Sequence, residues 1–363
     1  MTLDPTPSEF LNRARADLRM GLPVVIHDGP RAALVIAAEV LTPARLTDLQ
    51  ALGGQVHLAI TAHRAATLRA RPYDGDLARV QLPLQATPHW IRGVADPADD
   101  LRQPMKGPLM TVRDGAADLH RAAIALAKAA ELLPAALVLE HGQASTLARN
   151  HGLSQIALGV IEAARIDGSP LHPVIHARLP MAAAQAGRLH VFRPDDGGVE
   201  HYAIEIGQPD RSAPVLARLH SACFTGDVLG SLKCDCGAQL QAALARMGTE
   251  GAGVLLYLNQ EGRGIGLANK MRAYSLQDQG FDTVEANHRL GFDDDERDFR
   301  IGAALLRRMG FSRARLLTNN PGKVSMLSAN GVEVVERVPL RVGETDENRA
   351  YLATKAAKSG HLL

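Results

Sequence analysis

Cysteine, aromatic residues and an excess of either charge are all scarce in this chain. Its 363 residues include three cysteines, 4% aromatic residues and a formal net charge of +1. Three cysteines, all clustered between positions 223 and 236, do not make a disulfide framework. The balanced charge and the low aromatic content argue against nucleic-acid binding and against a general attraction to membranes.

Long apolar runs are missing as well. No run approaches the roughly 18–20 residues that cross a bilayer, and residues 1–21 lack the charged-then-apolar order of a secretion signal. We therefore expect a cytoplasmic protein without a membrane partner. A hydrophobic content of 46% and a charged content of 22% are typical of a soluble globular protein. The length exceeds one ordinary domain, which predicts two.

The amino-terminal half alternates apolar strand patterns with amphipathic helix patterns. The predicted strands are 23–29, 56–61 and 135–140, and the predicted helices are 8–21, 42–54 and 118–133. Such alternation predicts a mixed α/β fold. The periodicity stops around 166–180, where proline, glycine and histidine accumulate. We expect the domain boundary there, giving domains 1–172 and 173–363.

The carboxy-terminal half has the same alternating α/β pattern, with glycine-rich turns at the strand ends. Its predicted strands are 201–207, 213–222, 253–260, 314–320 and 332–338, and its predicted helices are 236–251, 267–280, 295–310 and 321–331. Ligands of α/β proteins usually bind at such strand ends.

The three cysteines indicate a metal site. Cys223 and Cys234 are separated by ten residues, and Cys234 and Cys236 by one. Thiolates bind zinc tightly, and three of them leave the fourth position open for a water whose pKa the metal lowers to about 7. Two alternatives stay open at this point: a closed structural zinc completed by His220, or three reduced, buried cysteines without a metal.

Two loops have the sequence features of anion-binding sites. Residues 259–270 and 318–323 each follow a predicted strand, contain glycine and open a helix, so their backbone N–H groups are suited to a phosphate. Each loop alone is equally consistent with a plain turn. Together with Arg218, Arg263 and Arg297, they indicate a highly charged substrate such as a nucleoside triphosphate.

Residues 177–363 resemble GTP cyclohydrolase II, the first committed enzyme of riboflavin synthesis. The resemblance rests on several long motifs in the correct order: RLHSACFTGDVLGSLKCDCGAQL, YLNQEGRGIGLANKMRAYSLQDQGFDTVEAN, LGFDDDERDF, LLTNNPGKV, VVERVPL and the tail YLATKAAKSGHLL.

The resemblance implies a chemistry. One catalytic zinc would be held by Cys223, Cys234 and Cys236, and its water would attack C8 of the guanine ring of GTP. Formate and pyrophosphate would leave, giving 2,5-diamino-6-ribosylamino-4(3H)-pyrimidinone 5′-phosphate. Magnesium is expected to accompany the triphosphate, and the protein is expected to be a homodimer.

Further roles are implied position by position. Tyr274 matches a tyrosine near the reacting ring and Asp295 a proton acceptor. Arg297 matches an arginine that either attacks the α-phosphate or stabilises it electrostatically. The residues that match nucleotide contacts are Arg218, Leu219, His220, Ser221, Ala222, Gln239, Glu261, Gly262, Arg263, Thr283, Thr318 and Lys323.

One position departs from the family pattern. Many members have glutamate before the first zinc ligand, whereas this chain has Ala222. We expect the site to survive, because the thiolates and the pair of Asp295 and Arg297 are intact. Contacts near Ala222 would then rely on the backbone.

The first 170 or so residues resemble 3,4-dihydroxy-2-butanone-4-phosphate synthase, but without its chemistry. The acid-rich loop after the first strand of that enzyme is reduced here to one acid, Asp28, which is too few oxygens for a hard cation. Leu119 stands where that family has histidine, and we expect His120 to be a surface residue at a helix start. Glu140 matches a retained acid. We therefore predict a degenerate, structural or regulatory domain.

Three other readings compete with a zinc-dependent GTP cyclohydrolase II. The chain could be bifunctional, with an active synthase half, although the missing acidic loop argues against this. It could be a paralogue that acts on another nucleotide, which Ala222 leaves open. The cysteines could also form a structural zinc module for nucleic-acid binding, against which charge and composition argue.

Overall fold

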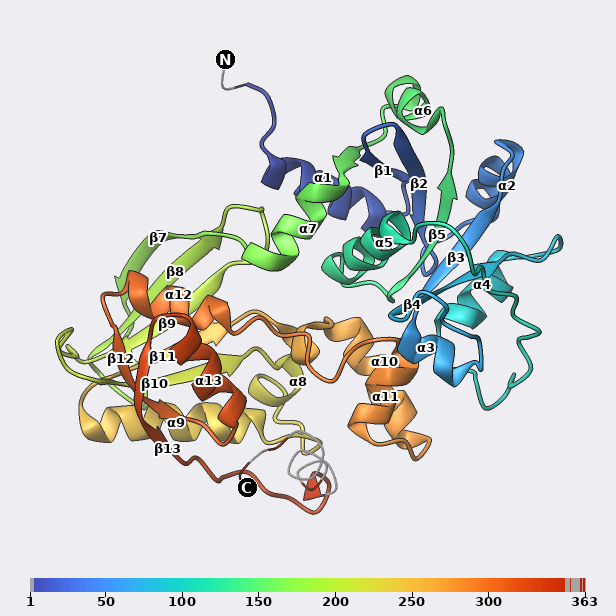
Figure 1. Ribbon diagram of the computed structural model, residues 1–363. Coiled ribbons are helices and arrows are strands. Elements are labelled where there is room, and N and C mark those ends of the chain that lie inside the picture. Colours follow the sequence, from blue (N-terminus) through green and yellow to red (C-terminus); the bar gives the residue numbers. More distant parts are fainter. Residues whose placement is uncertain (1–2, 350–352, 354–359, 361, 363) are drawn as a thin grey trace. The chain divides into compact units, whose positions relative to one another are not determined.

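The computed structural model describes residues 3–349, 353, 360 and 362 of the chain, and they fall into two compact units. The first unit comprises Met1–Asp167 and Ala268–Asp295, and the second comprises Gly168–Leu267 and Glu296–Leu363 (Figure 1). The sequence-based division at residue 172 differs from this one chiefly in residues 268–295, which pack with the amino-terminal unit. Most of the 351–363 tail motif lies outside the described residues.

The first unit contains a six-stranded sheet in the order β4-β3-β5-β2-β1-β6. Its strands are β1 (Val24–Asp28), β2 (Arg31–Ala37), β3 (Val56–Thr61), β4 (Leu77–Gln81), β5 (Ala135–Glu140) and β6 (Gln155–Ala157). Neighbours pair antiparallel except β1 and β6, which are parallel.

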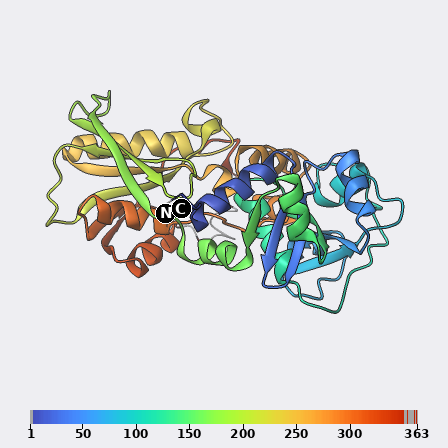
Figure 2. The ribbon, with the colours of Figure 1, turned by 90° about the horizontal axis from the view of Figure 1, so that it is seen from above.

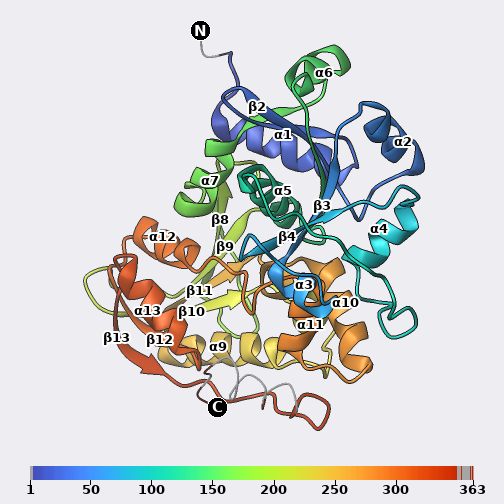
Figure 3. The same cartoon turned by 45° about the vertical axis from the view of Figure 1, so that its right-hand side comes forward.

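The helices of the first unit include the three that the sequence predicts. They are α1 (Pro7–Arg19), α2 (Pro43–Ala51), α3 (Ala62–Thr67), α4 (Pro88–Ala95), α5 (Asp118–Ala129), α6 (Ala144–His151), α7 (Leu158–Asp167), α10 (Leu267–Asp278) and α11 (Thr283–Leu290). Thr42 caps α2 by accepting from the Arg45 N–H, and Pro43 opens the helix, as the sequence indicates. Helices α1, α5 and α7 share one apolar core with the sheet (Figure 3).

The second unit contains a seven-stranded sheet in the order β13-β12-β10-β11-β9-β8-β7. Its strands are β7 (Leu171–Arg178), β8 (Gly187–Pro194), β9 (His201–Ile206), β10 (Val215–Ser221), β11 (Gly253–Leu258), β12 (Arg313–Leu317) and β13 (Glu333–Val338). Strands β13, β12, β10 and β11 are parallel to one another, and the remaining pairs are antiparallel.

Helices cover both faces of this second sheet. Helix α9 (Cys236–Glu250) packs its buried Ala243 and Met247 on one face. On the other face, α12 (Arg300–Arg308) and α13 (Pro321–Ala329) pack on β10, β11 and β12 (Figure 2). Two short elements, α8 (Phe224–Asp227) and the 3-10 helix η1 (Glu261–Gly264), follow β10 and β11. The expected α/β class is confirmed, and none of the described helices is long and apolar enough to cross a membrane.

The segment 166–180, in which the sequence predicts the domain boundary, contains strand β7. Its pairing with β8 shifts register between Pro173 and Ile175, and Pro173 is tolerated because β7 lies at the sheet edge, where a missing N–H costs no ladder bond. One sequence-based expectation about local structure is wrong. The helix expected from residue 295 begins at Arg300. The N–H groups of Glu296 and Asp298 donate instead to Arg263 O and Gln260 Oε1, which holds residues 296–298 as a loop.

The sequence-based expectation that His120 lies at the surface is also wrong. It lies at the start of α5, but its exposed fraction is 1%. Its Nε2 lies 3.4 Å from Nδ1 of His57, and its own Nδ1 is buried without a hydrogen-bond partner. Burial lowers the pKa of His120 to about 3. The folded first unit therefore holds this imidazole neutral at pH values where an unfolded chain protonates it.

This burial predicts an acid-sensitive stability. The folded pKa of His120 is depressed, so its contribution weakens as the pH falls below about 6.5 towards the folded value of about 3. Between pH 7 and 5 the loss is about 2 kcal/mol. We expect His120→Leu to show a smaller drop in Tm over this interval than the parent, by thermal unfolding. His151→Leu, at an exposed histidine, should keep the parental drop.

Candidate metal centre and anion-binding loops

The candidate site of the second unit lies where three parallel strands end. Strand β10 pairs with β11 on one side and β12 on the other, so their carboxyl ends meet at one edge of the sheet. The loops that follow these strands carry the cysteines, residues 259–263 and Thr318. This is the edge at which open α/β sheets bind ligands.

The three cysteines converge in the structure, as the sequence predicts. The ligand atoms of Cys223, Cys234 and Cys236 all lie within 4.8 Å of one another, and the Sγ atoms of Cys223 and Cys234 are 3.6 Å apart. Among the described residues, no other group of histidine, cysteine and acidic side chains is placed to hold a metal ion. The donor set is all thiol, which suits zinc and does not suit magnesium.

Two glycines allow the thiols to gather. A Cβ at Gly226 would lie 2.9 Å from Cys234 Sγ and 3.1 Å from Cys223 Sγ, and one at Gly237 would lie 2.2 Å from Gly226 O. The backbone of α8 thus forms a wall of the cluster, and it leaves no space for a side chain. Gly237, the second residue of helix Cys236–Glu250, is therefore a point of close backbone approach.

A buried carboxylate, Asp227, supports this cluster and was not found by sequence reasoning. Its side chain is 3% exposed. It accepts from the Cys223 N–H at 3.1 Å and from the Tyr257 hydroxyl at 2.9 Å, and it lies 3.0 Å from Nε2 of His220. His220 therefore faces Asp227 and is not a fourth ligand of the cluster. The only sequence signal was an acid four residues after a cysteine.

The protonation of each thiol in this cluster depends on its contacts with the other thiols. Hydrogen bonding to Cys223 raises the pKa of Cys234, and hydrogen bonds to the other two thiols, with burial, raise the pKa of Cys236 further. A bound divalent cation reverses this preference, because coordinating thiols are deprotonated. Three crowded, protonated thiols are thus an arrangement that a metal ion would stabilise.

A buried cation lies beside the cysteine cluster. Arg218 is 6% exposed, donates to Leu317 O at 3.0 Å and contacts Gln239, whose amide donates to Asp235 Oδ2 at 2.5 Å. Asp235 stands between Cys234 and Cys236. Burial lowers the pKa of Arg218 to about 10, and its buried Nε has no hydrogen-bond partner. The guanidinium remains charged at neutral pH and retains a donor for an anion.

The loop after β11 is held in a strained form. Gly262 has φ +62° and Arg263 has φ +63°, which is uncommon for a residue with a side chain. The Arg263 carbonyl accepts from the Glu296 N–H at 3.1 Å, while Glu261 accepts from the Phe224 N–H at 2.6 Å. These two hydrogen bonds connect residues 261–263 to the loop before α12 and to Phe224, the residue that follows Cys223.

The remaining predicted contacts of the second unit also fall at this edge. Arg297 donates to Ser221 Oγ at 3.4 Å and lies over the Phe299 ring, 4.8 Å from its centroid. Lys323 is 7% exposed and donates to Leu219 O at 2.8 Å. Thr318 is buried and its hydroxyl accepts from the Asn320 N–H. The backbone N–H of Ala222 donates to Leu258 O at 2.7 Å, so the sheet uses this donor.

Three predicted residues belong to the first unit. Tyr274 lies on α10, where the Lys270 ammonium is 5.7 Å from the centroid of its ring. Thr283 is the first residue of α11 and accepts from the Gln277 amide at 3.3 Å. Asp295 is exposed and is the last residue of the unit. All three residues belong to the first unit, whereas the three cysteines belong to the second.

Comparison with known proteins decides the family. The family model described as GTP cyclohydrolase II matches residues 172–339. GTP cyclohydrolase-2 of Azospirillum brasilense is 42% identical over 370 residues, covering 100% of this chain and 96% of that protein. This chain belongs to the GTP cyclohydrolase II family. Its cysteine cluster lies inside the matched region, as do the loops after β10, β11 and β12.

Shorter relatives match the carboxy-terminal part. GTP cyclohydrolase-2 of Azotobacter vinelandii is 58% identical over 175 residues, which cover 48% of this chain and 84% of that protein. Among solved structures, a two-domain 3,4-dihydroxy-2-butanone 4-phosphate synthase from A. baumannii covers 92% of this chain and 99% of its own, at 17% identity and a TM-score of 0.32.

The glycine at the cluster provides a test of metal binding. We expect Gly226→Ala to lose tight zinc binding, because the new Cβ would occupy the space of two Sγ atoms. Zinc content after gel filtration and a competitive chelator titration would measure this. Gly159→Ala, whose Cβ meets nothing within 4 Å, should bind like the parent. Unchanged zinc affinity in Gly226→Ala would contradict a site formed by these thiols.

Proposed function

We propose that this protein is a zinc-dependent GTP cyclohydrolase II that catalyses the first step of riboflavin biosynthesis. It would open the imidazole ring of GTP at C8 and release formate and pyrophosphate. The product would be 2,5-diamino-6-ribosylamino-4(3H)-pyrimidinone 5′-phosphate. The convergence of Cys223, Cys234 and Cys236 at the strand edge of a chain of this family carries the proposal.

The cysteines fit one zinc ion per chain. When bound, zinc supplies a water of lowered pKa, about 7, at a coordination position that three protein ligands leave open. Asp227 orients the Cys223 backbone through its N–H. His220 buttresses Asp227, and burial lowers the pKa of His220 in spite of the neighbouring carboxylate.

The cationic residues around this edge would bind the triphosphate. Arg218 and Lys323 are buried cations held by backbone carbonyls, so they are preorganised and lose little freedom when an anion binds. In the loop after β11, the N–H groups of Gly262 and Gly264 already donate to Glu261 Oε1 and to Gln260 O, so this loop would contribute the forked guanidinium of Arg263. Gln239, Ser221, Leu219, Ala222, Thr283 and Thr318 would complete the nucleotide contacts. Magnesium would travel with the triphosphate, because hard cations bind phosphate oxygens.

Arg297 has two candidate roles beside the α-phosphate. A nucleophilic role requires loss of a proton from a guanidinium that is protonated at neutral pH, for which Asp295 would be the acceptor. The guanidinium of Arg297 lies over the Phe299 ring in a cation–π arrangement, which supports electrostatic stabilisation. Tyr274 would act near the reacting ring.

A quench experiment separates the two roles of Arg297. We expect Arg297→Ala to lower kcat by about 10²–10³, as loss of a charge-stabilising donor does. With GTP labelled at the α-phosphate, an electrostatic role predicts no label on parent protein that is quenched with denaturant at alkaline pH, where the acid-labile N–P bond of a covalent adduct would survive. Label retained by the parent and absent from Arg297→Ala would instead establish the covalent role.

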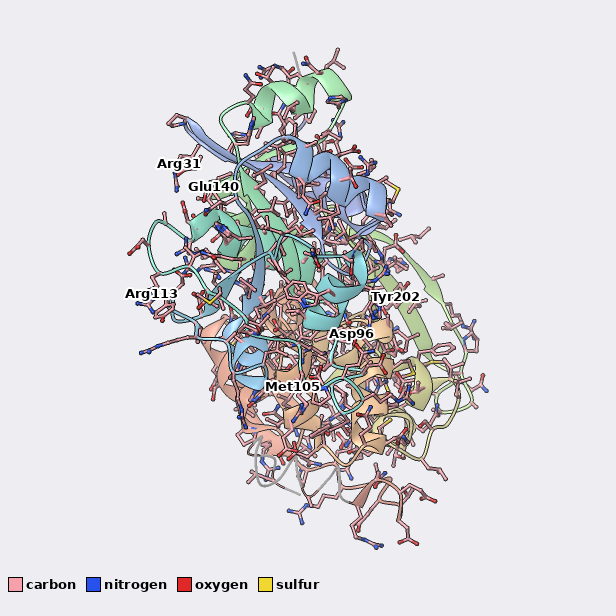
Figure 4. All side chains as sticks on the ribbon, turned by 90° about the vertical axis from the view of Figure 1, so that its right-hand side faces the viewer. Arg31, Asp96, Met105, Arg113, Glu140 and Tyr202 are labelled. Carbon is pink, nitrogen blue, oxygen red and sulfur yellow. The ribbon has the colours of Figure 1, made fainter. Side chains whose placement is uncertain are left out.

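The first unit is proposed to be catalytically inactive. Asp28, the single acid left after β1, is paired with Arg31 at 2.9 Å, and Arg31 also binds Asp118. Arg31 therefore neutralises the acids that a hard cation would need. Glu140, at the end of the neighbouring strand β5, is the remaining acid (Figure 4). We expect no conversion of ribulose 5-phosphate by the full chain, and conversion would support the bifunctional alternative. By resemblance we also propose a cytoplasmic homodimer.

The proposed activity is tested by turnover and metal content together. We expect the parent to release formate and pyrophosphate from GTP at about one zinc per chain. Cys234→Ser should lose both zinc and formate release, while Ser212→Ala, at an exposed turn, should keep both. Bound zinc without formate would overturn GTP as the substrate, and a panel of other nucleotides would then test the paralogue reading that Ala222 leaves open.

A further inference from the structure

The segment 268–295 belongs by sequence to the family match and by packing to the amino-terminal unit. It lies within the matched residues 172–339, yet it forms one compact unit with residues 1–167. It carries Tyr274, Thr283 and Asp295. Both of its ends continue directly into the second unit, at Leu267 and Glu296. Within the first unit, α11 lies beside α3 (Figure 3).

A buried arginine fastens the end of α11. Arg64 of α3 is 1% exposed and pairs with both oxygens of Asp100, at 2.5 and 2.9 Å. It also donates to Arg289 O at 3.4 Å, and Thr61 donates to Gly291 O at 2.8 Å. Carbonyls at a helix carboxyl end lack intrahelical partners and favour a cation, so these two residues cap α11.

A second attachment holds α10 two residues before Tyr274. Arg272 donates to Glu39 Oε1 at 2.8 Å and to Asp96 Oδ2 at 3.2 Å, and the side chain of Arg272 is 23% exposed. Its third donor bonds Asn269 Oδ1 at 2.7 Å, and the fully buried Asn269 donates to Glu131 O at 3.1 Å. Glu39, Asp96 and Glu131 all lie outside the family match.

A ring contact forms a third attachment on α11. His63 of α3 stacks on His288, with centroids 3.9 Å apart and an interplanar angle of 12°. His63 also pairs with Asp293 at 3.3 Å, and Lys128 of α5 lies 3.4 Å from the same carboxylate. Contacts from α3, α5 and Asp96, the residue after α4, are therefore distributed over both helices and the loop that leads to Asp295.

We propose that the amino-terminal unit serves as the positioning scaffold for the catalytic segment 268–295. In this view GTP turnover by this chain depends on residues that contribute no group to the reaction, with Glu39 and Asp96 acting through Arg272 on the helix that bears Tyr274. The proposal rests on the proposed function. A scaffold role needs only the residues that contact α10 and α11. The amino-terminal unit could therefore keep this role without any synthase activity.

The test removes the two amino-terminal partners and leaves the cyclohydrolase sequence untouched. Glu39→Gln/Asp96→Asn keeps acceptor oxygens for the N–H groups of Leu133 and Ala98 but removes both charges facing Arg272. We expect kcat for formate release to fall about tenfold, because small misplacements of reacting groups cost this much or more. Zinc content should stay at the parental value. The charge-conserving Arg272→Lys should retain more kcat than Arg272→Ala.

The matched control is the ion pair of Arg121 and Asp76 in the same unit, with contacts of 2.6 and 2.7 Å. Asp76→Asn should leave kcat unchanged, and combining Arg272→Ala with Glu39→Gln/Asp96→Asn should add little to either change alone. Parental kcat in Glu39→Gln/Asp96→Asn, or an equal loss in Asp76→Asn, would overturn the scaffold role.

Hydrogen exchange separates failure of this inference from failure of the proposed function. A parent that releases no formate would refute the function, whereas the scaffold role predicts a structural effect that needs no turnover. In Glu39→Gln/Asp96→Asn, amides of 268–290 should exchange faster than in the parent, and those of β5 should not. Unchanged exchange in this segment would refute the scaffold role, whether or not GTP is hydrolysed.

Discussion

The hydrogen bonds of one buried carboxylate organise the cysteine cluster of this protein. Asp227 joins the backbone of Cys223, the hydroxyl of Tyr257 and the ring of His220, which lie at the N-cap of α8, on β11 and on β10. A buried carboxylate is costly unless it is well hydrogen-bonded, so these groups must come together for the fold to be stable. The same bonds fix where the first thiol points, and the close approach of Gly226 then gathers the other two.

The surroundings of this centre follow from the sheet order. Three parallel strands end at one edge of the sheet, so Arg218 on β10, Lys323 on α13 and the strained turn at Arg263 are gathered at the edge that also carries the cysteines. The cations are tied to backbone carbonyls, and they are therefore ordered before any substrate binds. Such preorganisation is the usual origin of electrostatic stabilisation in enzymes.

Two sets of charged contacts stand out in the amino-terminal unit. Arg31 pairs with Asp28 and Asp118, while Arg64, Glu39 and His63 make contacts to α10 and α11. The contacts of Arg64, Glu39 and His63 to these helices do not involve Asp28. A structural dependence between the two sequence regions is thus compatible with an inactive synthase-like site.

The sequence by itself determined the family, the α/β class, the clustering of the three cysteines and most strand and helix positions, because these depend on local periodicity and on motifs of fixed spacing. It misjudged His120 and the start of α12, where burial and loop hydrogen bonds override local pattern. Only the tertiary structure revealed Asp227 as a support of the thiols and assigned residues 268–295 to the amino-terminal unit. Both depend on contacts between residues distant in sequence, which no local pattern encodes.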